Sequence, residues 1–168
     1  YMNTFTKTLA STVRISYMVL PPTLTEIFYQ KLSFYSCTVS NFEQYTLAAF
    51  IDQGYFEKHI NRMRLFYSRQ RKRLIEAIEQ SSLKEKCRII ENDSGLHFLL
   101  HLQTELSDHC LSEQLKQQGI KMLPLSEYFL TAENSREHYF IINYSCVDLE
   151  KIPAACERIH QLLSEKNA

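Results

Sequence analysis

The chain has 168 residues, of which 19 are lysine or arginine and 19 are aspartate or glutamate, so its formal net charge is zero. A neutral chain has no global field that attracts nucleic acid or an anionic membrane, so any nucleic-acid contact has to be local. Apolar residues make up 45% of the sequence, with ten tyrosines and ten phenylalanines, which excludes a disordered chain. At this length folding buries about 70% of the surface of the unfolded chain, enough for one core or two small ones.

The five cysteines show no paired spacing and no Cys-x-x-Cys motif, and their number is odd. This pattern favours free thiols in a reducing compartment and predicts a cytoplasmic protein. The apolar runs are well short of the about 20 residues that a membrane helix needs. No charged and then apolar leader opens the chain. We therefore expect a soluble protein with no membrane partner.

The first third of the chain combines turn-forming segments with two helical patterns. Ile15–Leu20 is an apolar run that predicts a buried strand, and Pro21 ends it because proline cannot donate to a strand ladder. Apolar residues recur at helical spacing over residues 24–32, which predicts a short amphipathic helix. A second helix is expected over Asn41–Gln53, with its first residue as the cap and Gly54 just past its end.

Residues 55–80 carry the longest helical pattern, with apolar side chains near one face and a cluster of basic side chains on the others. The remainder predicts strand, strand, helix, strand, strand and helix, in that order. These elements are expected over residues 87–90, 96–102, 107–118, 120–125, 139–144 and 148–165, with a turn at 92–95 and a polar loop at 133–137. With the long helix they predict a compact α/β layer of about 110 residues.

A lysine and an arginine, Lys7 and Arg14, stand seven residues apart near the start of the chain. A lysine that is desolvated beside another cation is partly neutral, so Lys7 can form an imine with an aldehyde. The planar guanidinium of Arg14 can hold a phosphate, assisted by the hydroxyl groups of Thr4 and Thr6. An aldehyde and a phosphate on one small molecule describe pyridoxal 5'-phosphate. The structural alternatives are an exposed loop lysine, an arginine in a surface ion pair and threonines that merely favour a strand.

The segment Thr4–Pro21 as a whole resembles the cofactor-lysine segment of fold-type-I aminotransferases. It is most similar to the MocR/GabR branch of the GntR transcriptional regulators, whose effector domain has an aminotransferase fold. The likeness continues through residues 44–51, through the glycine, histidine, Met-Arg, tyrosine and basic residues of 54–74, and at the Gly-Leu-His-Phe run of 95–98. The resemblance therefore covers almost the whole chain.

The resemblance implies an α/β fold: the end of the large domain plus the complete small domain of a fold-type-I, pyridoxal-phosphate-dependent aminotransferase-like protein. Residues 1–54 are expected to be the C-terminal end of the cofactor-binding large domain. Residues 55–168 are expected to be the small α/β domain with its long linking helix. Because the chain opens only a few residues before Lys7, we expect it to be a C-terminal fragment of a longer protein.

For the function, the resemblance implies that the chain is part of the effector-sensing domain of a transcriptional regulator. It favours a chain that is not itself an enzyme. In the intact protein Lys7 would hold pyridoxal phosphate as an internal aldimine, with Arg14, Thr4 and Thr6 on the phosphate. A small amine or amino-acid effector would displace Lys7. DNA would be bound only through an N-terminal winged helix-turn-helix domain that this chain does not resemble. A homodimer without a metal site is expected.

Two other functions stay open. The same lysine segment occurs in aminotransferases of class I/II, which pass an amino group from an amino acid to a 2-oxo acid while the lysine also moves a proton. The chain can also be a structural or dimerising remnant. The resemblance places the other groups around the cofactor before Tyr1, so we expect the chain by itself to hold pyridoxal phosphate weakly or not at all.

Two further patterns have both a chemical and a structural interpretation. The basic cluster of residues 62–73, with Phe66 and Tyr67 among it, is compatible with nucleic-acid binding, but a charged run on a long helix more often forms a solvated face. His97 and His101 share one face of a strand and can in principle bind a metal. No nearby cysteine or carboxylate completes a set of ligands, so we expect core or rim histidines.

Overall fold

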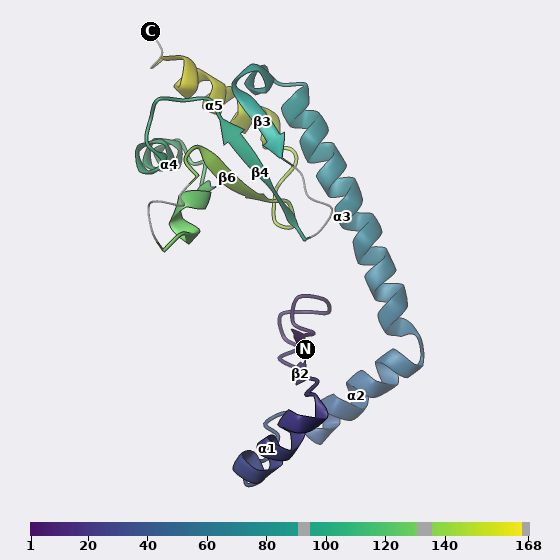
Figure 1. Ribbon diagram of the computed structural model, residues 1–168. Helices are drawn as coiled ribbons and strands as arrows, with labels where there is room; N and C mark the ends of the chain where they lie inside the picture. The colour runs from purple at the N-terminus through teal and green to yellow at the C-terminus, as the bar shows by residue number, and fades with distance from the viewer. Residues whose placement is uncertain (91–94, 131–135, 166–168) are drawn as a thin grey trace. The chain divides into compact units, whose positions relative to one another are not determined.

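The computed structural model of the chain describes residues 1–90, 95–130 and 136–165. The chain divides into two compact units, Tyr1–Arg64 and Leu65–Ala168, here called unit 1 and unit 2. The division falls inside helix α3 (Tyr55–Glu79), the longest helix of the described residues (Figure 1). The predicted boundary between residues 54 and 55 lies at the first residue of this helix. The assignment of the two parts to a large and a small domain stays a prediction.

Unit 1 contains two short strands and two helices ahead of α3. Strands β1 (Met2–Thr4) and β2 (Ser16–Met18) pair antiparallel, with Thr4 opposite Ser16. Helix α1 (Pro22–Leu32) begins at a proline, whose missing N–H costs no helix hydrogen bond at that position. Helix α2 (Asn41–Asp52) occupies the second predicted helical segment. The two helical patterns of the first third are therefore confirmed.

The cap of α2 lies one residue before its predicted position. The sequence predicts Asn41, whereas Ser40 is the residue whose Oγ accepts a hydrogen bond from the N–H of Glu43, at 3.3 Å. The Ser40 hydroxyl in turn donates to the Glu43 carboxylate at 2.8 Å, so the side chains support each other at the helix start. Gly54 follows α2 as predicted and has a φ of +73°, a conformation that favours glycine.

The prediction that Ile15–Leu20 forms a buried strand is wrong about burial. The strand β2 covers three of these residues, and Tyr17 and Met18 are 40% and 47% exposed. Among the residues that the structure describes, it pairs with β1 alone, in a two-stranded sheet. A two-stranded ribbon cannot cover both of its own faces, which explains the exposure. Strand β1 itself was not expected, because three residues are too few to show a periodic pattern.

Unit 2 confirms the predicted order of strands and helices. Its sheet is antiparallel throughout, with the strand order β3-β4-β6-β5. The register places Leu100 of the central strand β4 opposite Ile89 on one side and Phe140 on the other. The elements that follow α3 are η1 (Ser82–Lys86), β3 (Cys87–Ile90), β4 (His97–Leu102), α4 (Asp108–Gln117), β5 (Leu123–Pro124), η2 (Leu125–Tyr128), β6 (Tyr139–Asn143) and α5 (Ile152–Glu165).

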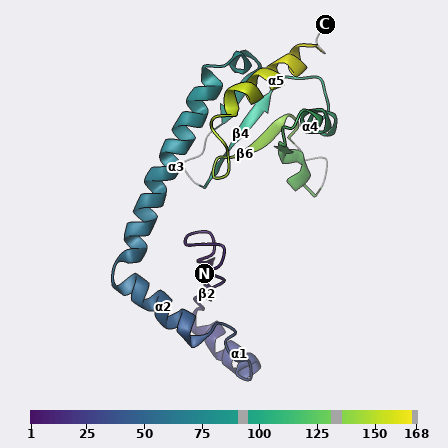
Figure 2. The same ribbon diagram turned by 180° about the vertical axis from the view of Figure 1, so that it is seen from behind.

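One face of this sheet carries the core of unit 2. Phe98, Leu100 and Leu102 alternate along β4 with more exposed residues, and each is at most 1% exposed. Helix α5 lies on one face of the sheet, behind β4 and β6 in Figure 1 and in front of them in Figure 2. Unit 2 is therefore a two-layer α/β unit. The helices contribute Leu74, Ile78, Leu111, Leu115, Cys156, Ile159, Leu162 and Leu163 to the core.

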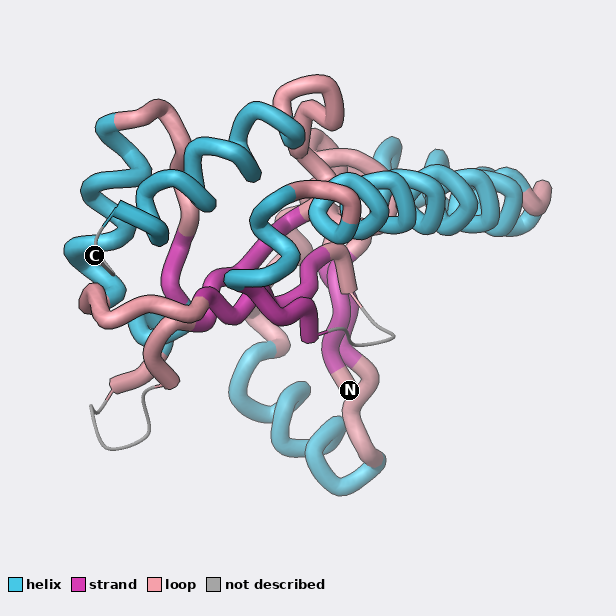
Figure 3. The backbone as a smooth tube through the Cα atoms, turned by 90° about the horizontal axis from the view of Figure 1, so that it is seen from above, coloured by secondary structure: helices cyan, strands magenta, loops and turns pink. Residues whose placement is uncertain are grey.

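The long helix α3 confirms the predicted helix over residues 55–80 to within one residue. Figure 3 shows it as one uninterrupted helix. Its basic cluster is mostly exposed, and the Lys72 ammonium lies 3.7 Å from the Glu76 carboxylate one turn away, as a solvated face predicts. No helix in the described ranges combines the length and the apolar character that crossing a bilayer requires.

Two predicted elements are shorter than expected. The strand predicted over 120–125 is reduced to the two residues of β5, since Pro124 has no N–H to donate to a longer ladder. Asp148 is predicted to cap the last helix but lies in the turn before it, where its Oδ1 accepts from the N–H of Glu150 at 3.2 Å. The predicted turn at 92–95 and polar loop at 133–137 lie largely outside the described residues.

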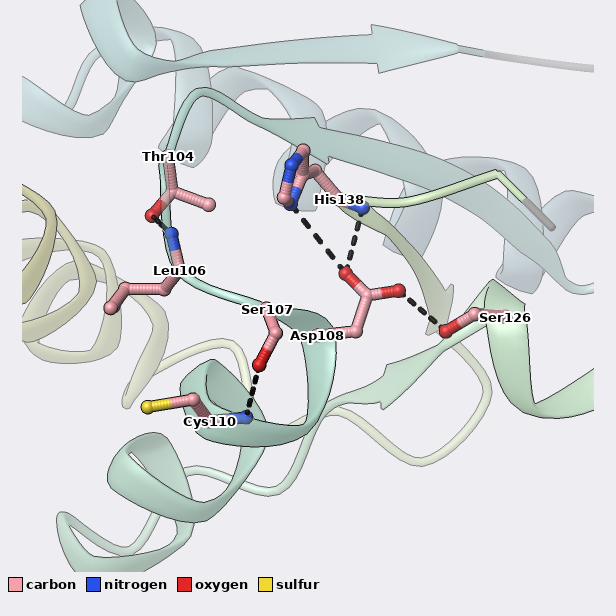
Figure 4. Close-up of polar contacts among 7 residues, drawn as sticks. All are labelled: Thr104, Leu106, Ser107, Asp108, Cys110, Ser126 and His138. Carbon is pink, nitrogen blue, oxygen red and sulfur yellow. Dashed lines mark hydrogen bonds and ion pairs between the residues drawn. The ribbon is translucent and has the colours of Figure 1, made fainter. Parts of the chain in front are cut away.

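Asp108 joins three separate segments of unit 2 (Figure 4). The residue is 8% exposed; Oδ1 accepts from the N–H of His138 at 2.7 Å, and Oδ2 accepts from the Ser126 hydroxyl at 2.5 Å. His138 has a φ of +66°, which is unusual for a residue with a Cβ, and the carboxylate holds its N–H in that conformation. The carboxylate lies between hydroxyl and imidazole, so this cluster is a structural clamp and not an activated nucleophile.

We expect Asp108→Ala to lower the free energy of unfolding of unit 2 by about 2–4 kcal/mol, because two partly buried donors lose a charged acceptor. Urea unfolding followed by circular dichroism measures this loss. Glu113→Ala is the matched control in the same helix. Within the described ranges the Glu113 carboxylate pairs with Lys116 alone, at 3.3 Å and exposed, so its loss should cost less than about 0.5 kcal/mol. Equal costs for the two substitutions would contradict the clamp.

The five cysteines are all free thiols and divide into exposed and sheltered groups. Burial raises the pKa of Cys87 to about 11 and also raises the pKa of Cys156, whereas Cys37 and Cys146 are exposed. Only a thiolate is alkylated, so iodoacetamide at about pH 8 should modify the exposed pair first. Mass spectrometry should show the Cys87 rate rising about tenfold per pH unit toward its pKa. A Cys87 rate that levels off below about pH 9 would refute the shift.

Candidate functional site

The lysine and the arginine singled out from the sequence lie on one loop, residues 5–15, between β1 and β2. The antiparallel pairing ends at Thr4 and Ser16, and the N–H of Phe5 extends it by donating to the carbonyl of Ile15 at 2.9 Å. The loop therefore leaves the two-stranded sheet and returns to it at adjacent points.

Two threonine hydroxyls close the base of this loop. The Thr6 hydroxyl donates to the carbonyl of Val13 at 2.8 Å. The Thr4 hydroxyl lies 3.1 Å from both the carbonyl of Ile15 and Thr6 Oγ1, and it accepts from the N–H of Thr6 at 3.3 Å. Both threonines are half-buried. We call this set of side-chain hydrogen bonds the threonine clasp.

The threonine clasp fixes the backbone beside both cations. Val13 and Ile15 flank Arg14, and Thr6 immediately precedes Lys7. The side chains of Lys7 and Arg14 are exposed, and neither has a hydrogen-bond or ion-pair partner in the part of the chain that the structure describes. A free amine and a free guanidinium are thus held on one loop.

This donor set fits the two reactive ends of pyridoxal phosphate. A primary amine condenses with an aldehyde, and a guanidinium is a bidentate partner for a phosphate. The exposure of Lys7 means that the loop by itself does not desolvate the amine. The residues present therefore suit attachment and anchoring, through Lys7 and Arg14 respectively.

The threonine hydroxyls were expected to bind a phosphate, but here they make hydrogen bonds within the loop. Each hydroxyl has one proton. Thr6 donates it to the carbonyl of Val13, and Thr4 has the carbonyl of Ile15 and Thr6 Oγ1 within reach. In this conformation neither proton is directed to a phosphate. The role of Thr4 and Thr6 as phosphate ligands stays a prediction.

The backbone around Lys7 forms a closed turn. The N–H groups of Thr8 and Leu9 both donate to the carbonyl of Phe5, at 3.1 and 2.8 Å. Lys7 lies in the middle of this turn, so its Cα position follows from the position of the turn. We call residues 5–9 the lysine turn.

The first turns of α3 contact both ends of the lysine turn. His59 Nε2 lies 3.1 Å from the carbonyl oxygen of Thr8, and the rings of Phe5 and Phe56 meet edge to face with centroids 5.9 Å apart. Sequence reasoning did not give either α3 residue a functional role, because about 50 residues separate the partners. The one sequence signal is that the two α3 residues are three apart and so share a helix face.

A largely apolar cavity of about 390 Å³ lies between the loop, α2 and His59 of α3. Neither Lys7 nor Arg14 lines it, so the cations and the cavity are separate features of unit 1. A phosphate requires cationic or N–H donors, which these walls do not concentrate. The apolar residues of the walls are Leu9, Ala10, Val13, Ile15, Phe42, Leu47 and Phe50.

The two histidines of β4 have different surroundings. His97 is exposed. The centroid of the His101 ring lies 4.7 Å from that of the Tyr139 ring and 6.5 Å from that of the His138 ring. Partial burial, followed by the charges of His138 and Arg88, lowers the pKa of His101. Within the described ranges, no three His, Cys, Asp or Glu side chains converge in a way that can hold a metal ion.

Comparison with known proteins relates these features to a family. The family model for aminotransferases of class I and II matches residues 1–159. The HTH-type transcriptional regulator YdeL of Bacillus subtilis is 43% identical over 126 residues, which cover 75% of this chain and 27% of the regulator. The probable rhizopine catabolism regulatory protein MocR of Rhizobium meliloti is 33% identical over 148 residues, 88% of this chain and 29% of MocR. The chain spans less than a third of the length of these two relatives.

Solved structures agree with the sequence match. Kynurenine aminotransferase of Pyrococcus horikoshii superposes with a TM-score of 0.79 at 27% identity, over 99% of this chain and 40% of that enzyme. A multiple-substrate aminotransferase of Thermococcus profundus gives the same TM-score at 23% identity, which supports the fold alone. The expected fold class, part of a fold-type-I aminotransferase-like α/β protein, is confirmed. This chain belongs to the aminotransferase class I and II family.

Proposed function

We propose that this chain is part of the aminotransferase-like, effector-sensing region of a transcriptional regulator, and that Lys7 is the residue that links to pyridoxal phosphate. The observation that carries the proposal is the loop of residues 5–15, which holds a free amine and a free guanidinium beside the threonine clasp. The role in a transcriptional regulator is supported by relatives in Bacillus subtilis and Rhizobium meliloti that are named as a transcriptional regulator and a regulatory protein.

Lys7 and Arg14 have different tasks in this proposal. The cofactor, when bound, supplies an aldehyde that condenses with amines and a ring that withdraws electrons. Lys7 provides the amine for covalent attachment, and an amine effector competes with it for the same position. Arg14 offers its planar fork to the phosphate. The threonine clasp fixes the backbone at Lys7 relative to the backbone at Arg14, while the amine and the guanidinium bind the cofactor.

We also propose a homodimer in the cytoplasm that contacts DNA through a domain outside this chain. The HTH designation of the Bacillus subtilis relative supports the DNA partner. The five free thiols suit a reducing compartment. The effector is a small amine or an amino acid, because only an amine can replace Lys7 chemically.

A second candidate is an aminotransferase that passes an amino group from an amino acid to a 2-oxo acid. It is favoured by the 27% identity and the 0.79 TM-score with kynurenine aminotransferase over 99% of the chain. Lys7 would then have the additional task of carrying a proton between two carbon atoms after its release.

Borohydride trapping tests the role of Lys7. Pyridoxal phosphate is mixed with the chain, reduced with borohydride and located by mass spectrometry. We expect weak binding, with the adduct on Lys7 several-fold above that on Lys31. Arg14→Ala should lower the Lys7 adduct about ten- to a hundredfold, since a charged phosphate contact of about 1.5–3 kcal/mol is lost.

Lys31→Ala is the control for trapping, because Lys31 is an exposed lysine in α1 of the same unit. It should leave the Lys7 adduct unchanged. Equal labelling of all lysines, or an Arg14→Ala chain that labels like the unchanged chain, would contradict the proposal.

An amino-transfer assay separates the two candidate functions. Protein from the full reading frame that contains this chain is incubated with pyridoxal phosphate, an amino acid and a 2-oxo acid. We expect a rate no faster than that of its Lys7→Ala variant, together with effector-dependent DNA binding. Turnover that Lys7→Ala abolishes would instead favour the enzyme.

A further inference from the structure

We infer that His59 is a positioning residue that holds the lysine turn on α3; its importance for cofactor attachment rests on the proposed function of Lys7. His59 is half-buried in the second turn of α3. Its Nε2 lies 3.1 Å from the carbonyl oxygen of Thr8, the residue that follows Lys7. With its proton on Nε2, the imidazole donates a hydrogen bond to this carbonyl.

The two ends of the lysine turn are held in different ways. At the first end, the N–H of Phe5 donates to Ile15 at 2.9 Å, and the Phe5 ring contacts Tyr17 and Phe56 at centroid distances of 5.4 and 5.9 Å. At the second end, the contact with α3 is the hydrogen bond from His59. Loss of this bond leaves the peptide group between Thr8 and Leu9 held only from its other side, by the Leu9 N–H on the Phe5 carbonyl at 2.8 Å, while the first end stays in place.

The position of His59 is well determined by the start of α3. Gly54 adopts a φ of +73°, which allows the chain to turn from α2 into α3, and the N–H of Lys58 donates to the Gly54 carbonyl at 3.3 Å. Phe56 and His59 lie three residues apart on one face of the helix. One side chain packs on the lysine turn and the other donates to it, so the helix fixes both contacts together.

The hydrogen bond matters for attachment because condensation needs the amine in a restricted position. A lysine turn that has lost the hydrogen bond from His59 lets Lys7 sample more positions, which lowers the fraction of time that its amine spends in a reactive arrangement. Neutral imidazole with the proton on Nε2 and imidazolium both donate to a carbonyl. The alternative is that His59 only fills space beside the loop.

Two substitutions separate donation from space filling. His59→Gln keeps an amide N–H at a similar reach, whereas His59→Phe keeps a ring but has no donor. His109→Phe is the matched control, because His109 is an exposed histidine on α4 in unit 2. Hydrogen exchange of the Leu9 amide is the first measurement, since this N–H closes the lysine turn.

We expect His59→Phe to speed exchange of the Leu9 amide about fivefold, as the loss of one hydrogen bond predicts, and His59→Gln to restore the slower rate. His109→Phe should change nothing in this loop. A His59→Gln chain that exchanges as fast as His59→Phe would overturn the inference, and so would an unchanged rate in His59→Phe.

Borohydride trapping with pyridoxal phosphate gives the second measurement. The Lys7 adduct should fall about fivefold in His59→Phe and recover in His59→Gln. If the unchanged chain shows no preference for Lys7, the proposed function fails, while the hydrogen-exchange result still decides whether His59 holds the turn. Faster Leu9 exchange in His59→Phe without any effect on a preferred Lys7 adduct would overturn the role in positioning.

A third measurement needs no substitution and covers the case in which His59→Phe does not fold. Long-range proton–nitrogen correlation of the unchanged chain reports which imidazole nitrogen of His59 carries the proton. A protonated Nε2 is the expected result. A neutral ring protonated only on Nδ1 cannot donate to Thr8, and it would overturn the inference.

Discussion

The threonine clasp is the interaction on which the candidate site depends. Thr4 and Thr6 place side-chain hydrogen bonds on the carbonyls of Ile15 and Val13, at the point where the ladder between β1 and β2 has ended. Each such hydrogen bond contributes only about 1 kcal/mol net to the stability of the loop. Several of them, together with the hydrogen bond from the Phe5 N–H, are therefore needed to hold it. Together they offset part of the entropy cost of ordering the loop.

Sequence reasoning succeeded where the signal was long or periodic. The 25 residues of α3 and the alternation along β4 both follow from spacing of apolar side chains. Sequence reasoning failed where two adjacent residues can both cap a helix, and where the partners of a contact are far apart in the sequence. Ser40 and Asn41 are both good caps, so the pattern could not choose between them. Asp108 meets residues 18 and 30 positions away, and no local pattern encodes such a pair.

The candidate site shows the same division. Lys7 and Arg14 are candidates that their chemistry and the family resemblance single out, and their roles stay predictions. The partners of the threonine hydroxyls could not be predicted, because a phosphate and a backbone carbonyl are both acceptors and loop closure decides between them. The contact between His59 and Thr8 spans 51 residues, so it requires the folded unit to be known.

One fold serves named enzymes and named regulators. In the function proposed above, the distinction depends on what the Lys7 amine does after attachment. Moving a proton between carbon atoms benefits from a dry, enclosed site and a desolvated lysine. Attachment needs only an amine within reach of the aldehyde. The loop fixes the backbone through the threonine clasp and His59 but leaves the Lys7 side chain exposed. A fixed backbone with a free amine suits exchange of one amine for another, which is the minimum that a sensor requires.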